Sequence, residues 1–333
     1  MTYALGLMAV VFSTLLVFSY LVGIWWLDRY EREPFWLVVV TFLWGGLGGT
    51  LLGCILSLVM SVSVVDVVPL AYMDLYTSVI VAPLAEEFTK GLIFLVLLLT
   101  PFIDNETDGL IYGAATGLGF AVVENLIYFF AVAMTEPEFF YYTLVMRTLF
   151  TALMHCISSA LLGFAIGYVR HRELWPKLWL VPIVGFFFAV AMHGLWNLLA
   201  VLSGSGLVDG EVETLLLGII LVILMSIAMF VITQLSLYRE HRVIAKYLAE
   251  EAERGVLPKA HAEIIPFWRK RLGNNWLPAH VPKNSYLEAT TLLAFRRYQL
   301  ETSADRYNSK YQKEVDHYRK EVGALLEGNP QGK

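Results

Sequence analysis

The chain has 333 residues, of which 57% are hydrophobic and 16% are charged. Ordinary soluble domains are roughly 45–50% apolar, so this composition excludes a soluble globular enzyme and indicates a membrane protein. The net charge of −5 averages two unlike parts, because residues 1–238 hold 7 of the 24 Lys and Arg residues while residues 239–333 hold 17. We therefore predict a membrane-embedded domain over 1–238 and a mostly helical tail over 239–333, and we expect no nucleic-acid partner.

Seven apolar runs are each long enough to form a transmembrane helix, which needs about 20 residues. They lie at residues 4–27, 35–62, 77–100, 109–134, 143–169, 178–202 and 212–237. The sequence thus predicts an all-α fold, a polytopic membrane bundle of about seven transmembrane helices followed by a cytoplasmic helical tail.

The tail has its own helical pattern. We expect one helix over 238–254, stopped by Gly255 and Pro258, and a second from about Tyr286. The basic cluster at 269–271 is interpreted as a solvated face, with contact to anionic lipid as the alternative.

Basic residues in the short loops predict the orientation, because Lys and Arg favour the cytoplasmic side. The first loop contains Arg29 and Arg32, the fifth contains Arg170, Arg172 and Lys177, and the second, fourth and sixth contain neither Lys nor Arg. We therefore expect the N-terminus outside and the tail in the cytoplasm. The first run has no basic region before it and no small-residue cleavage site, so we expect it to stay as a span.

Glycines four residues apart form one stripe in the second run and another in the fourth. Such stripes let helix backbones approach closely in lipid, so we expect close helix contacts there. The stripes consist of Gly45, Gly49 and Gly53, and of Gly109, Gly113 and Gly117.

Ionisable side chains lie inside four of the apolar runs, where a charge costs at least about 2.5 kcal/mol. With a rise of about 1.5 Å per residue, one such group on each of the four helices falls about 14–18 Å below the outer helix end. Groups that share one depth predict a single polar site within the membrane. They are Glu86, with its neighbours Glu87 and Lys90, then Glu124, His155 and His193.

Helical spacing adds supporting residues to this site. Lys90 follows the acid pair by three and four residues, so its ammonium shares a face with both carboxylates. Tyr128 follows Glu124 by four residues, as Asn197 follows His193. A further basic residue, Arg147, lies near the outer end of the fifth run, where it is placed to pair with a carboxylate.

Several short motifs between residues 28 and 200 occur in a specific order. They are Asp28 to Pro34, Pro83 to Lys90, Asp108 to Gly113, Gly117 to Asn125 with Tyr128, His155, and His193 to Asn197. Together they resemble the PrsW family of intramembrane proteases, in the wider superfamily of CAAX-processing and bacteriocin-immunity proteases. The tail lies outside the resemblance.

The resemblance implies an activity and roles for four residues. It places Glu86 and Glu87 in the catalytic centre of an intramembrane protease, and it assigns His193 and Asn197 to polarising the scissile carbonyl. It also implies a bacterial inner membrane and a membrane-spanning protein substrate, for instance an anti-sigma factor. Metalloprotease and glutamate-protease mechanisms are both compatible with the family.

Two positions differ from the CAAX-protease pattern. Lys90 stands at the fourth position from the first glutamate, where CAAX proteases have an arginine at the fifth. Glu124 stands four residues after Phe120, where CAAX proteases have a histidine. Both differences resemble the PrsW branch.

Peptide hydrolysis needs a base for water, donors for the oxyanion and an acid for the leaving amine. We predict Glu86 as the base, with Glu87 as second choice, and Glu124 as a proton relay. The predicted catalytic residues are Glu86, Glu87, Glu124, His155 and His193. The predicted supporting residues are Lys90, Asn125, Tyr128, Arg147 and Asn197.

Three alternatives stay open at this point. The first is zinc hydrolysis, with Glu124, His155 and His193 as ligands, although the sequence has no compact metal motif and we place a metal-free route slightly ahead. The second is a proton-coupled transporter, which gathers similar intramembrane groups. The third is a non-catalytic membrane scaffold whose tail binds a cytoplasmic partner.

Overall fold

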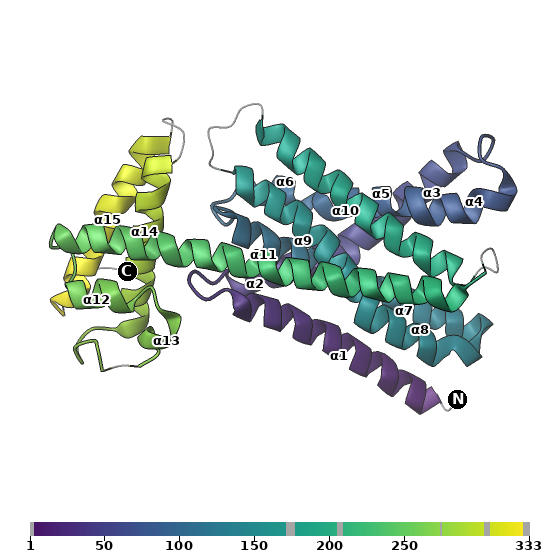
Figure 1. The fold of residues 1–333 in the computed structure, drawn as a ribbon, viewed down its shortest axis with the longest axis horizontal. Coiled ribbons are helices and arrows are strands. Elements are labelled where there is room, and N and C mark those ends of the chain that lie inside the picture. The colour runs from purple at the N-terminus through teal and green to yellow at the C-terminus, as the bar shows by residue number, and fades with distance from the viewer. Residues whose placement is uncertain (1–2, 171–176, 205–208, 274, 303–306, 329–333) are drawn as a thin grey trace. The chain divides into compact units, whose positions relative to one another are not determined.

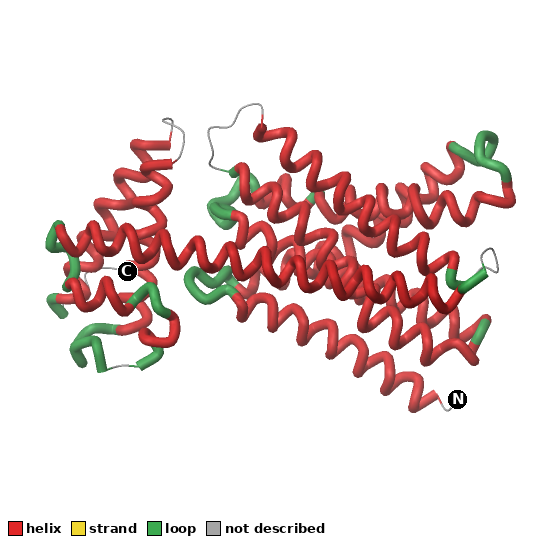
Figure 2. Tube along the Cα trace, in the orientation of Figure 1, coloured by secondary structure: helices red, strands yellow, loops and turns green. Residues whose placement is uncertain are grey.

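A computed structural model describes the chain except for residues 1–2, 171–176, 205–208, 274, 303–306 and 329–333. The described residues form helices and loops without any strand (Figure 2), as the predicted all-α fold requires. They divide into two compact units. The membrane unit comprises the described residues of Met1–Leu27, Glu33–Arg170 and Trp175–Val231, and the tail unit those of Asp28–Arg32 and Ile232–Lys333.

Within the described residues, six helical segments are long and apolar enough to cross a membrane, which confirms a helical membrane bundle. Four are single helices: α1 (Tyr3–Leu27), α7 (Glu106–Thr135), α10 (Lys177–Leu202) and α11 (Glu211–Glu253). Two are composite, and Figure 1 labels their α-helical parts, α2, α3, α8 and α9. The first consists of α2 (Phe35–Leu43), the π-helical turn η1 (Trp44–Gly49) and α3 (Thr50–Ser63). The second consists of the 3₁₀ turn η3 (Pro137–Phe139), α8 (Phe140–Met146), the π-helical turn η4 (Arg147–Thr151) and α9 (Ala152–Val169).

The run predicted as a span at 77–100 is not among these six, so the count of seven remains a prediction. It folds as α4 (Leu70–Tyr76), a π-helical turn η2 (Thr77–Val81), α5 (Ala82–Gly91) and, after a break, α6 (Ile93–Leu97). The π-turn η2 has a local cause, because Pro83 has no backbone N–H and its ring clashes with the carbonyl four residues earlier. A π-turn immediately before a proline relieves that conflict.

Close packing of α7 against α9 holds two of the site helices together. A Cβ added to Gly109, Gly113 or Gly117 would lie 2.0–2.3 Å from a backbone oxygen of α9. In the other stripe, a Cβ at Gly45 would lie 1.9 Å from the Thr116 carbonyl oxygen on α7. Both stripes therefore mark close helix contacts, as the sequence predicts.

The tail unit has its own apolar core, built mainly from the end of α11 and from α12 (Lys259–Ile264), α14 (Lys283–Thr302) and α15 (Asn308–Leu326). The short helix α13 (Trp268–Arg271) lies between α12 and α14 in the chain. Gly255 ends α11 with a φ of +81°, in the left-handed region that favours glycine, so the predicted helix stop is confirmed. An ion pair links this helix to α15, where the partly exposed Arg319 contacts both carboxylate oxygens of the buried Glu251 at 2.7 Å. The predicted division at 238/239 stays a prediction, as does the orientation. Arg172, used for the orientation, lies outside the described residues.

Candidate active site

The two adjacent glutamates on α5 have different surroundings. Glu87 is fully buried, and its Oε1 contacts three groups: Lys90 Nζ at 2.5 Å, His193 Nδ1 at 2.9 Å and the hydroxyl of Ser158 at 3.0 Å. Its Oε2 accepts a hydrogen bond from Ser159 at 3.3 Å. Both oxygens of Glu87 are thus hydrogen-bonded to protein groups, so this carboxylate is fixed in place and enclosed by them.

Glu86 instead faces a cavity of about 540 Å³. Its Oε2 is buried and has no hydrogen-bond partner among the described residues, and His193 Nε2 lies 3.7 Å away. Adjacent helical residues point about 100° apart, which explains why one glutamate is enclosed while the other lines the cavity. Other predicted site residues also line it: Glu124, Tyr128, Arg147, His155 and Asn197.

Glu124 on α7 lies in a second charged group. Its Oε2 contacts Arg147 Nη2 at 2.5 Å and His155 Nε2 at 2.8 Å. Arg147 lies in the π-turn η4, donates from Nε to Asn125 Oδ1 at 3.1 Å, and stacks 3.6 Å from the centre of the Tyr128 ring. The arginine thus neutralises the acid and is itself held by two of the predicted supporting residues.

His155 connects the two charged groups. Its Nδ1 lies 3.2 Å from Lys90 Nζ, so the ammonium on α5 donates to it. With Nδ1 accepting, the proton of a neutral ring sits on Nε2 and points at Glu124. The centre of the His193 ring lies 4.7 Å from that of His155, at an interplanar angle of 85°. Groups from α5, α7, α9 and α10 therefore meet at one place, as their common predicted depth requires.

Asn197 takes its position from the π-turn η2. Its Nδ2 donates to the Ser78 carbonyl oxygen at 2.9 Å, and the side chain lines the cavity. An asparagine amide has two N–H donors, so one is left for a substrate oxygen. A Cβ at Gly194 would lie 2.5 Å from the Val79 carbonyl, so a glycine beside His193 lets α10 approach η2 closely.

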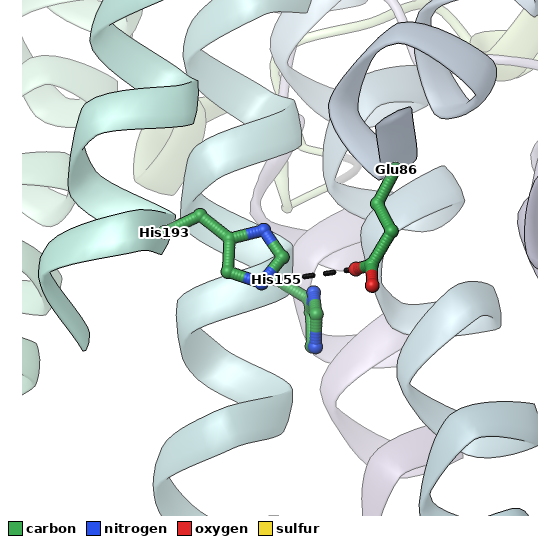
Figure 3. A group of neighbouring side chains, drawn as sticks. All are labelled: Glu86, His155 and His193. Atoms are coloured by element: carbon green, nitrogen blue, oxygen red, sulfur yellow. Dashed lines mark ion pairs between the residues drawn. The ribbon is translucent and has the colours of Figure 1, made fainter. Parts of the chain in front are cut away.

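Three of these groups could hold a metal ion. Figure 3 shows Glu86, His155 and His193 converging, and their ligand atoms lie within 4.8 Å of one another. One carboxylate with two imidazoles is the donor set of many catalytic zinc sites. Because Glu87 fixes His193 through Nδ1, the Nε2 lone pair faces Glu86, as in carboxylate–histidine–metal arrangements. The donor set fits a divalent metal, with Glu86 in place of the predicted Glu124.

The same surroundings oppose metal binding in two respects. Both nitrogens of His155 are engaged, by Lys90 and by Glu124, so ligation requires one of these hydrogen bonds to break. The Lys90 ammonium next to the site also repels a cation.

Two residues of the site were missed by the sequence analysis. Ser158 and Ser159 both donate to Glu87, yet serine is common at ordinary helix contacts in membranes. A signal was present, since they follow His155 by three and four residues and so share its helix face.

Comparison with known proteins identifies the family. The sequence model described as PrsW family intramembrane metalloprotease matches residues 33–232, more than half of the chain. A protein named Protease PrsW from Geobacillus kaustophilus is 31% identical over 181 residues, covering 52% of this chain and 72% of that protein.

A second Protease PrsW, from Clostridioides difficile, is 25% identical over 194 residues, covering 57% of this chain and 79% of that protein. No solved structure matches the chain. These matches support the protease interpretation over the transporter and scaffold alternatives. With the membrane bundle and its buried polar site, they show that the chain is an integral membrane protease that belongs to the PrsW family.

Proposed function

We propose that the chain is an endopeptidase that hydrolyses a peptide bond of a membrane-spanning protein, with Glu86 activating the water. One observation carries this proposal: Glu86 is the member of the acid pair that faces the cavity, and its buried Oε2 has no hydrogen-bond partner among the described residues. A carboxylate so placed is free to accept a proton from a water molecule beside it.

Glu87 then acts through His193 rather than on the substrate. A carboxylate that accepts from Nδ1–H fixes the tautomer and the orientation of the imidazole, which leaves Nε2 facing Glu86. Lys90 compensates the buried charge of Glu87 at 2.5 Å. The two carboxylates therefore have different roles: Glu86 accepts the proton of the water, and Glu87 positions the His193 ring.

Glu124 and His155 are suited to relay the proton towards the leaving amine. The 2.8 Å hydrogen bond between them joins two groups that can each bind a proton, and both line the cavity. Arg147 compensates the charge of Glu124 by direct contact at 2.5 Å. We assign the free N–H of Asn197 to the oxyanion, together with His193 when that ring is doubly protonated.

If a metal is present, Glu86, His155 and His193 would hold it. A bound zinc ion lowers the pKa of its water and polarises a carbonyl. Glu86 would then serve as a ligand, and proton acceptance would pass to Glu124, the other carboxylate lining the cavity. The engaged nitrogens of His155 favour the metal-free route.

We further propose where the substrate is cut. The cavity extends from Glu86 to Val132, Tyr142 and Ser203, which lie near the end of α7, the start of α8 and the end of α10. In the predicted topology all three ends are on the outer side. A single-span substrate, such as an anti-sigma factor, would therefore be cut in the outer half of its span, where a helix end unwinds most easily.

The test compares membrane fragments from cells that carry the wild-type chain or Glu86→Gln. Glutamine keeps the size and the hydrogen bonding of the side chain but accepts no proton. The matched control is Glu138→Gln, the same change at an exposed position in η3. We expect fragments that disappear with Glu86→Gln and persist with Glu138→Gln, with new termini in the outer half of a span. Cuts confined to the cytoplasmic side would mean that the topology or the depth of the site is wrong.

A further inference from the structure

We propose that the tail unit carries a membrane-surface site that binds anionic lipid headgroups, built around α13. The site, here called the interfacial patch, consists of Tyr238, Arg242, Phe267, Arg269, Lys270 and Leu272. It lies outside the region that matches the protease family, and it is independent of the hydrolytic site.

The first observation is exposed apolar surface at one place. Beyond the predicted end of the last span at 237, the described residues include three exposed large apolar side chains: Tyr238 at 58%, Phe267 at 45% and Leu272 at 57%. Tyr238 and Phe267 are joined through His241, whose ring centre lies 6.3 Å from the first ring and 4.9 Å from the second. A patch of this kind on an otherwise polar unit marks an interaction surface.

The second observation is that basic side chains accompany these apolar groups. Lys270 Nζ lies 4.2 Å from the centre of the Phe267 ring, and Arg242 donates to the Tyr238 hydroxyl at 3.4 Å. Arg242, Arg269 and Lys270 are exposed. Aromatic and basic residues together are typical of segments that lie at the headgroup level of a membrane.

The third observation ties the patch to chain that leaves the membrane. Tyr30 donates to the Pro266 carbonyl at 3.0 Å, and Arg271 donates to the Arg29 carbonyl. Tyr30 stands three residues after Leu27, the end of the first candidate span, so about 10 Å of chain at most separates them. Tyr238 directly follows the predicted last span. The patch is therefore held near the membrane surface at two points.

The basic cluster at 269–271, interpreted from the sequence as a solvated face, contains one buried and two exposed side chains. Arg271 is buried, with its guanidinium 5.1 Å from the centre of the Tyr30 ring, and serves the loop contact. Arg269 and Lys270 are exposed and available to an anionic surface. Within residues 259–273 the acidic side chain is Glu263 alone, against four Lys and Arg residues, so the segment is net positive.

The test measures amide hydrogen exchange over residues 267–273 in the full-length protein. One sample is in nanodiscs of phosphatidylcholine, the other in nanodiscs that also contain phosphatidylglycerol. We expect exchange about tenfold slower with the anionic lipid, the gain that one or two basic residues provide at such a surface, and a return to the faster rate at high salt.

Two double variants with the same charge change separate the patch from general electrostatics. Arg269→Glu with Lys270→Glu should abolish the lipid-dependent slowing, whereas Lys313→Glu with Lys320→Glu, exposed on α15, should retain it. A third variant, Leu272→Asn, should reduce the slowing without changing the charge. Equal exchange in both lipids, or equal loss in both double variants, would overturn the proposal. Slowing seen only in native membrane vesicles would assign the patch to a protein partner and overturn it as well.

Discussion

Gly117→Ala is the substitution that tests most sharply how the fold positions the site. A Cβ on this residue of α7 would lie 2.1 Å from the His155 carbonyl oxygen on α9, and ordinary contact begins at 3.4 Å. The helices must therefore separate by about 1.3 Å, the difference between these two distances. Alanine alone would favour the helix by roughly 1 kcal/mol, so any loss arises from packing.

The displacement acts directly on His155. Its hydrogen bond to Glu124 on α7, 2.8 Å long, would lengthen beyond bonding range if the two backbones separated by that amount. Misplacing a catalytic group by about 1 Å can cost about 100-fold in rate. We expect Gly117→Ala to cleave about 100-fold more slowly while still inserting into the membrane.

The assay follows the rate at which Glu86-dependent fragments appear, corrected for the amount of folded protein. Gly23→Ala is the neutral control, because nothing lies within 4 Å of its Cβ position. Gly109→Ala is the packing control, since its Cβ meets the Gly163 oxygen at 2.0 Å but lies about 12 Å along α7 from Gly117. A Gly117→Ala protein with the wild-type rate, or a larger loss in Gly109→Ala, would refute the reasoning.

Three other outcomes are expected. Lys90→Met leaves Glu87 buried without its cation, so the free energy of unfolding should fall by about 3–5 kcal/mol, and an unchanged thermal midpoint would contradict the pairing. Gly255→Ala should lower the free energy of unfolding of the tail unit by about 1–2 kcal/mol, because alanine disfavours the positive φ, and should speed amide exchange at the end of α11. Gly273→Ala, at a position without a positive φ, should change neither. Metal analysis of active protein should find no stoichiometric zinc; about one zinc per chain, lost with His193→Ala, would establish the metal route instead.

The sequence predicted that the site exists but not how its parts are oriented. Their place inside apolar runs and their common depth predicted that Glu86, Glu124, His155 and His193 lie close together. Ionisable groups within a membrane usually face the bundle interior and pair with one another. The enclosure of Glu87 was not predictable, since the π-turn η2 inserts an extra residue per turn and rotates everything after it.

The fold was predicted to a similar extent. Six of the expected runs appear as candidate spans because their length and hydropathy are local properties. The helix around Pro83 was expected as one continuous span, but the structure interrupts it with a π-turn. Its backbone geometry depends on packing against α10 as well as on the local sequence. The burial of Arg271 could not be predicted from the sequence either, since its partner, the loop at Arg29, is 242 residues away in the chain.

Cleavage by the purified Glu86→Gln protein tests the central claim most directly. The substrate is a single-span protein that yields Glu86-dependent fragments, reconstituted with the enzyme in liposomes. We predict no cleavage, with a thermal unfolding midpoint close to that of the wild type, because glutamine fills the same space beside the cavity. Cleavage by Glu86→Gln at near the wild-type rate would show that Glu86 does not activate the water.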